Sequence, residues 1–259
     1  MNYESYSILI DTCSMARISL YCEVCNQLKM TVGTSIDKIE SEIKIKQGFP
    51  LIDSLSFLKE GYSIYKYLKE KRETRNAFIL YFSQFAKIEL YDIFLDISFD
   101  EMLTKNGISY RLRRKKPFRW QVDFDFNKQV KDRYDLIENS LNKINILISI
   151  PEKESPVTHN LPFDINSVLL SHVFLDSFDS YLYSLSLSLM VDDFLTSDNE
   201  LRDIIKKFQS DKEWKTHLDN MKKSIIQISS SHREMCYDEN THKSQLTKFH
   251  LPNIPNLKK

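Results

Sequence analysis

Glycine is scarce in this chain, which argues against two common nucleotide-binding loops. Only four of the 259 residues are glycine, and neither GxGxxG nor GxxxxGK[ST] occurs. Rossmann-type and P-loop phosphate binding are therefore disfavoured. Net charge is lacking too, because 36 basic residues balance 36 acidic ones. No general electrostatic field draws this chain to nucleic acid or membrane, so any such affinity must be local.

Cysteine is also sparse, with four residues in the chain. Cys22 and Cys25 have CxxC spacing, but no second pair is present to complete a zinc tetrad. The spacing of His232, Cys236 and His242 matches no common zinc finger. We expect reduced thiols in an intracellular, cytoplasmic protein. No basic segment followed by an apolar core opens the sequence, so a secretory signal is not expected.

One apolar stretch, residues 168–191, has nearly the hydrophobicity of a membrane span. Asp176 and Asp179 fall within it, among many serines. Carboxylates near the middle of a span are costly in lipid. The stretch therefore favours a buried amphipathic helix in a protein that does not enter the membrane.

Short apolar runs that end at polar residues predict the strands of an α/β fold. These runs are Ile8–Ile10, Phe78–Phe82, Ile148–Ile150 and Phe194–Thr196. Segments with helical spacing alternate with them, among them Thr12–Leu28, Ile52–Glu73, Gln84–Asp96 and Tyr134–Leu147. This order predicts three layers, with a central, mostly parallel sheet flanked by helices.

The remaining segments suggest insertions and a tail. We expect one domain over residues 1–228, with helical and loop insertions at about 33–75 and 104–165, and a polar, flexible tail at 229–259. Val122, Phe124 and Phe126 alternate with polar residues, which predicts a half-buried strand. Residues 151–162 lie between two prolines and are expected to form a loop. Ser83 is expected to cap the helix that starts at Gln84.

Four acidic residues stand where a metal site could form. Asp11 directly follows the first strand and Asp198 follows the last, and ligands bind at the carboxyl edge of such sheets. Glu89 and Asp179 lie on helices, next to an apolar face, where an unpaired acid is costly. Clustered carboxylates are hard oxygen ligands and select Mg2+ or Mn2+. The auxiliary candidates are Thr12, Asp176 and Thr196.

The order and setting of these acids resemble the PIN-domain family of metal-dependent nucleases. Asp11 in Ile-Asp-Thr-Cys matches the first acid of the family, and Glu89, Asp179 and Asp198 match the second, third and fourth. The resemblance implies RNA cleavage by a metal-activated water, with all four acids as catalytic and metal-binding residues. Cys13 departs from the pattern, because Asn is common there. Asp92 on the same helix is the alternative to Glu89.

A basic run supplies a candidate RNA contact. Its six basic residues are interleaved with Tyr110, Phe118 and Trp120, a combination suited to phosphate contacts and base stacking. The basic residues are Arg111, Arg113, Arg114, Lys115, Lys116 and Arg119.

Other interpretations stay open at this point. Asp11 and Asp198 could simply cap the helices that follow them, and Ser197 to Glu200 has capping-box spacing. The chain could be a catalytically inactive RNA-binding or assembly module. It could also be a toxin-like effector restrained by a regulatory protein partner. The sequence leaves a homo-oligomer open as well.

Overall fold

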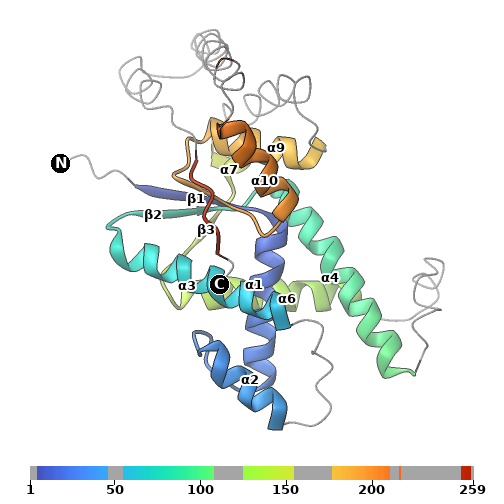
Figure 1. Cartoon of the computed structure of the whole chain (residues 1–259). Coiled ribbons are helices and arrows are strands. Elements are labelled where there is room, and N and C mark those ends of the chain that lie inside the picture. Colours follow the sequence, from blue (N-terminus) through green and yellow to red (C-terminus); the bar gives the residue numbers. More distant parts are fainter. Residues whose placement is uncertain are drawn as a thin grey trace. The chain divides into compact units, whose positions relative to one another are not determined.

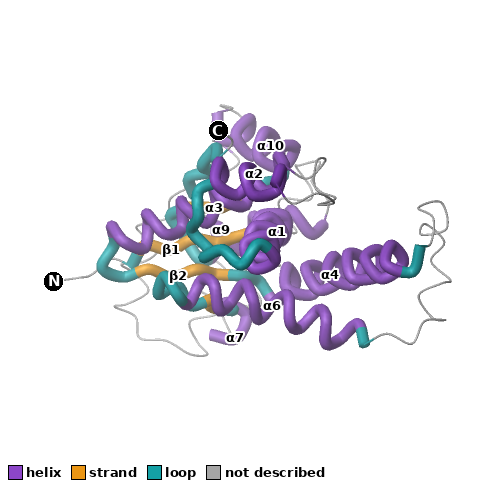
Figure 2. Tube along the Cα trace, turned by 90° about the horizontal axis from the view of Figure 1, so that it is seen from below, coloured by secondary structure: helices purple, strands orange, loops and turns teal. Residues whose placement is uncertain are grey.

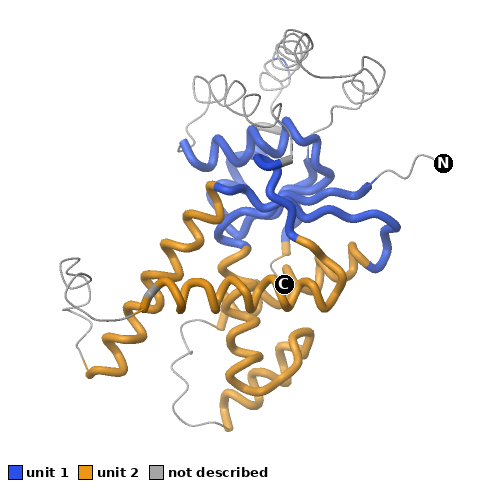
Figure 3. The backbone as a smooth tube through the Cα atoms, turned by 180° about the vertical axis from the view of Figure 1, so that it is seen from behind, with its two compact units in different colours: residues 1–14, 73–84, 148–256 blue, residues 15–72, 85–147, 257–259 orange. Residues whose placement is uncertain are grey.

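The structure is a computed structural model that describes residues 5–45, 55–107, 125–154, 177–210, 216 and 252–257. The chain divides into two compact units, shown in Figure 3. Unit 1 comprises residues 1–14, 73–84 and 148–256, and unit 2 comprises residues 15–72, 85–147 and 257–259. The sequence had suggested one domain over 1–228 and did not indicate this division.

Unit 1 contains a four-stranded, all-parallel sheet in the order β3-β2-β1-β4 (Figures 1 and 2). The expected α/β class and parallel pairing are confirmed. All four strands lie at the apolar runs from which they were predicted: β1 (Tyr6–Ile10), β2 (Phe78–Tyr81), β3 (Ile148–Ser149) and β4 (Asp193–Leu195).

The central strand β1 is held by burial. Ile8, Leu9 and Ile10 are each 0% exposed, so side chains on both faces of the strand are covered. Such continuous burial is typical of parallel sheets and explains why the run is apolar instead of alternating. The strand ends at Asp11, where the polar residues of the edge begin.

The described part of unit 1 contains the helices α7 (Pro151–Glu154), α9 (Ser177–Ser188) and α10 (Asn199–Ser210). The expectation of a loop from 151 is wrong at its start, because Pro151 begins α7 and proline suits a first helical position. Within α9, residues 180–187 are buried despite three serines. Two of their hydroxyls donate to carbonyls about one turn back: Ser184 Oγ to Ser180 O at 2.7 Å and Ser186 Oγ to Tyr183 O at 2.6 Å. Burial of these two hydroxyls therefore leaves them hydrogen-bonded, whereas the buried Ser180 hydroxyl has no hydrogen-bond partner among the described residues.

The helices α1 (Thr12–Gln27) and α4 (Gln84–Lys105) begin in unit 1 and continue into unit 2. Unit 2 also contains α2 (Ile36–Ile45), α6 (Phe126–Asn142) and α3 (Leu55–Thr74) except for the last two residues of α3, which belong to unit 1. The expectation of a strand that ends at Phe126 is wrong at that residue. Phe126 starts the helix α6, and the Asp125 carboxylate caps this helix by accepting from the Lys128 N–H at 3.0 Å. Val122 and Phe124 lie outside the described residues.

Close packing and ion pairs join the helices in the described part of unit 2. A Cβ added to Gly61 on α3 would lie 2.0 Å from the Arg17 carbonyl oxygen on α1, so only glycine fits there. Arg133 on α6 contacts Glu23 on α1 at 2.5 Å and Glu101 on α4 at 2.8 Å. Burial raises the pKa of Glu23, and the Arg133 charge opposes that rise.

Two further observations bear on the sequence-based expectations. No helix in the described ranges has a stretch both long and apolar enough to cross a bilayer. Within the expected flexible tail, Asn253 forms a parallel bridge with Asp193 of β4. That part of the tail, dark red in Figure 1, has a defined place in unit 1.

Candidate functional site

The register of the sheet brings the ends of β1 and β4 together. Ile10 pairs with Leu195, so the next residues, Asp11 and Thr196, leave the sheet at the same level. The Asp11 N–H donates to the Leu195 carbonyl oxygen at 3.0 Å. The first acid and the Thr-Ser-Asp segment thus lie at one edge, as the sequence predicted from their positions after strands.

Asp11 is a buried carboxylate whose surroundings raise its pKa. It is 3% exposed. Burial raises its pKa from the ordinary 3.8 to about 6, hydrogen bonds from Thr196 and Ser14 oppose the rise, and the nearby charge of Asp198 adds to it. One of the Ser14 contacts is its N–H, which donates to Asp11 Oδ1 at 2.6 Å. Asp11 therefore caps α1 and also lies within electrostatic reach of Asp198.

Asp198 is half-buried and caps α10. Its Oδ1 accepts from the Glu200 N–H at 2.7 Å and the Leu201 N–H at 3.1 Å. Its own N–H donates to Thr196 Oγ1 at 3.0 Å. Because the Thr196 hydroxyl also hydrogen-bonds Asp11, one threonine links the two acids. Each acid thus performs the capping that its position suggested, and the pair remains close at the edge of the sheet.

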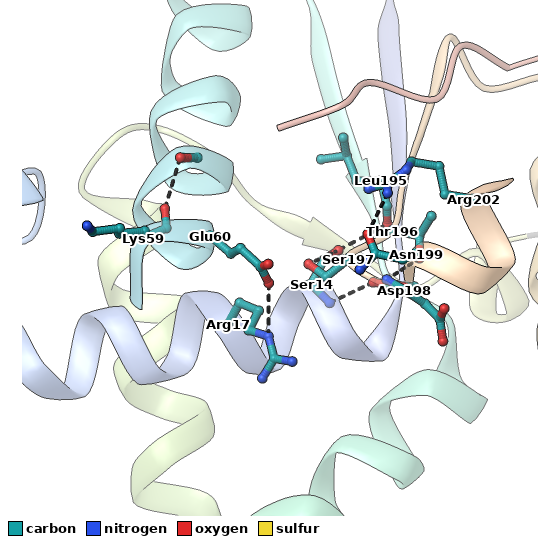
Figure 4. A network of polar contacts seen from close by, with 12 residues as sticks. Ser14, Arg17, Lys59, Glu60, Leu195, Thr196, Ser197, Asp198, Asn199 and Arg202 are labelled. Atoms are coloured by element: carbon teal, nitrogen blue, oxygen red, sulfur yellow. Dashed lines mark hydrogen bonds and ion pairs between the residues drawn. The ribbon is translucent and has the colours of Figure 1, made fainter. Parts of the chain in front are cut away.

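Two serines that the sequence analysis did not assign complete this edge. Ser14 Oγ lies 3.2 Å from Ser197 Oγ and 3.4 Å from the Leu195 carbonyl oxygen (Figure 4). Ser14 is buried and Ser197 is half-buried. Ser14 stands three residues after Asp11, at the helix position whose N–H a capping acid accepts, and that spacing could have indicated it.

A second buried acid of unit 1 was missed altogether. Glu152 on α7 is 4% exposed. Its carboxylate accepts from Ser83 Oγ at 2.5 Å, from the Gln84 N–H at 3.1 Å and from the Tyr181 hydroxyl at 3.2 Å. Glu152 therefore accepts the first N–H of α4 and also the hydroxyl of Ser83, the residue expected to cap that helix. No local sequence signal joins residues so far apart.

The other two predicted acids, Asp179 and Glu89, lie on helices, as expected. Asp179 lies in the first turn of α9, half-buried. Glu89 belongs to unit 2, where it is exposed on α4, as is its alternative Asp92. The sequence pattern also placed Phe85 and Ile88 on the apolar side of this helix, but their side chains are 42% and 60% exposed.

The structure describes two of the three auxiliary candidates, but neither the third nor the basic run. Thr12 and Thr196 are buried in unit 1, at 2% and 7% exposure. Asp176 and the whole basic run, residues 111–119, lie outside the described residues.

At this edge, a metal ion would have only one or two carboxylate ligands from the described part of the chain. Among the residues that the structure describes, no three His, Cys, Asp or Glu side chains form a group that could hold a metal ion. Mg2+, however, commonly binds proteins through one or two carboxylates and takes its other ligands from water and substrate phosphates. Asp11 and Asp198 meet that lower requirement, and their mutual repulsion is of the kind that a cation relieves.

Comparison of the chain with protein-family models, with curated proteins and with solved structures found no match.

Proposed function

We propose that the chain is a divalent-metal-dependent endoribonuclease with a three-layer, PIN-like arrangement, in which Asp11 and Asp198 hold Mg2+ or Mn2+. The observation that supports this most is the linked pair at the sheet edge. Asp11 is buried with a pKa raised to about 6, partly because Asp198 is near. A buried acid kept close to a second acid is costly to a fold without a cation, so the arrangement favours a function for the pair.

The residues of the edge have separate tasks in this proposal. Thr196 orients the Asp11 carboxylate, and its hydroxyl also accepts the Asp198 N–H. Ser14 and Ser197 present hydroxyls beside the pair and can hydrogen-bond a phosphate oxygen or a water. The metal, when bound, supplies an activated water and stabilises the charge on the phosphoryl group. Asp179 adds a third acid from α9, and the basic run at 111–119 binds the RNA backbone.

The test compares wild type with Asp11→Asn, because Asn still caps a helix but carries no charge. Mn2+ binding is measured by titration calorimetry and RNA cleavage on a mixed RNA pool with Mn2+. We expect wild type to bind Mn2+ and cleave, and Asp11→Asn to lose both. Asp203→Asn is the matched control, since Asp203 on α10 is an acid whose side chain is 73% exposed. Equal cleavage by wild type and Asp11→Asn would refute the proposal.

One observation favours a second function, an RNA-binding module without hydrolysis. Asp11 Oδ1 and Asp198 Oδ1 are both used to cap helices, and Glu89 is exposed in the other unit. This alternative predicts no heat with Mn2+. It also predicts RNA affinity that is unchanged by Asp179→Asn.

A further inference from the structure

The outer edge of β4 is covered by a remote part of the same chain. In the order β3-β2-β1-β4, β4 is the last named strand, so one of its backbone edges faces away from β1. Residues 252–256 lie along that edge (Figure 1, dark red). We name residues 252–256 the strap. In the sequence, residues 211–251 connect α10 to the strap.

The strap is attached as an added strand. The Asn253 N–H donates to the Asp192 carbonyl oxygen at 2.8 Å, and the Phe194 N–H donates to the Asn253 carbonyl oxygen at 2.9 Å. Pro252 and Ile254 are buried on either side of the exposed Asn253, and Ile254 is 5% exposed. This alternation is the pattern of a peptide that adds to a sheet edge, with main-chain hydrogen bonds for affinity and buried side chains for selectivity.

A side-chain contact adds to the backbone pairing at the centre of the strap. Asn253 Nδ2 donates to Asp193 Oδ1 at 2.9 Å, and the Tyr6 hydroxyl donates to Asp193 Oδ2. Asp193 is 1% exposed, so its carboxylate depends on protein donors for hydrogen bonds. Release of the strap would remove one of these donors from a buried acid, and an asparagine in an incoming peptide would restore it.

We propose that the outer edge of β4 is a docking surface for an extended peptide, filled here by the strap, and that the strap of a second copy of the chain occupies it in trans. Exchange of an identical segment between copies needs no new contacts, because every bond that forms in trans already exists in cis.

The experiment uses a fluorescent peptide with the sequence of residues 250–259 and the full-length chain carrying Ile254→Asp. This change places a charge at a buried side chain of the strap and should free the edge. We expect the peptide to bind the variant, measured by fluorescence anisotropy, and to bind wild type at least tenfold more weakly because the wild-type edge is occupied. Absence of binding to the folded variant, or equal binding to both chains, would overturn the proposal.

Two altered peptides test the geometry itself. A peptide N-methylated at Asn253 keeps every side chain but lacks the N–H that donates to Asp192. A peptide with Asn253→Asp has nearly the same shape but places a carboxylate against Asp193. Both should bind Ile254→Asp at least tenfold more weakly than the parent peptide, and unchanged affinity for either would contradict the proposed contacts.

If Ile254→Asp does not fold, a milder variant can be used to test the same proposal. Asn253→Ala in the full-length chain removes only the side-chain bond to Asp193 and leaves Ile254 in place. The parent peptide should bind Asn253→Ala more tightly than wild type, because the weakened strap competes less. Equal affinity for these two chains would also count against the docking surface.

Discussion

The clearest prediction concerns the pH dependence of stability at Asp11. Its pKa in the folded chain is about 6, against an ordinary value of 3.8. The folded state therefore binds this proton more tightly than the unfolded state does. Its contribution to stability is fully present below about pH 4 and is lost as the pH rises through 6. Asp11→Asn removes the titrating group and should remove this pH dependence.

The magnitude follows from the two pKa values. Their difference of about two pH units, at about 1.4 kcal/mol per unit, gives about 3 kcal/mol. Of this, about 2 kcal/mol should be lost between pH 4.5 and 7.5, because the carboxyl is already partly ionised in the unfolded chain at pH 4.5. Asp11→Asn should thus gain about 2 kcal/mol of unfolding free energy relative to wild type over that interval.

The assay is urea unfolding of wild type and Asp11→Asn at pH 4.5 and 7.5, with chelator present to remove metal. Asp203→Asn controls for the loss of one negative charge. A stability difference between wild type and Asp11→Asn that is the same at both pH values would refute the assignment of a buried, proton-binding Asp11.

The proposed ion site predicts a second effect on stability. Mn2+ at a hundred times its dissociation constant should stabilise wild type at pH 7.5 by about 2.7 kcal/mol.

Three further changes test contacts within the two units. Glu152→Ala leaves three donors without their acceptor and should lower the unfolding free energy by about 3 kcal/mol in urea titrations. Gly61→Ala should lower the melting temperature by several degrees in calorimetry, because its Cβ would overlap the Arg17 carbonyl oxygen. Arg133→Met leaves Glu23 buried without its partner and should cost about 3 kcal/mol or more in urea, most of which a second change, Glu23→Met, should restore.

The sheet was predictable because its signals are local. An apolar run such as Ile8–Ile10 can be buried only in a few ways, and an acid directly after it marks where the strand ends. The same reasoning placed Asp11 and Thr196 at one edge, since parallel strands end together. Helix caps follow from spacing too, as Asp198 before α10 illustrates.

The features that sequence analysis missed depend on contacts between distant residues. Glu152 is buried because donors from β2's end and α9 surround it, and nothing near residue 152 signals this. The strap looks like a polar tail in the sequence, because its backbone hydrogen bonds and the contact of the Asn253 side chain with Asp193 are all made with β4 and its neighbour Asp192, far away in the sequence. The face of α4 was misjudged because apolar residues occur all around that helix, so that periodicity alone did not separate Ile88 from Leu90.

The separation of β1 from β4 has a consequence for synthesis of the chain. β1 and β4 pair although they are far apart in the sequence. Ser7 on β1 and Asp192, the residue before β4, form a hydrogen bond and are 185 positions apart. At roughly 5–20 residues per second, a ribosome makes the partner of β1 about 10–40 seconds after β1 itself. During that interval the edge of β1 that pairs with β4 in the finished sheet has no partner. A chaperone that covers this edge until β4 is made would protect nascent β1 from pairing with another chain.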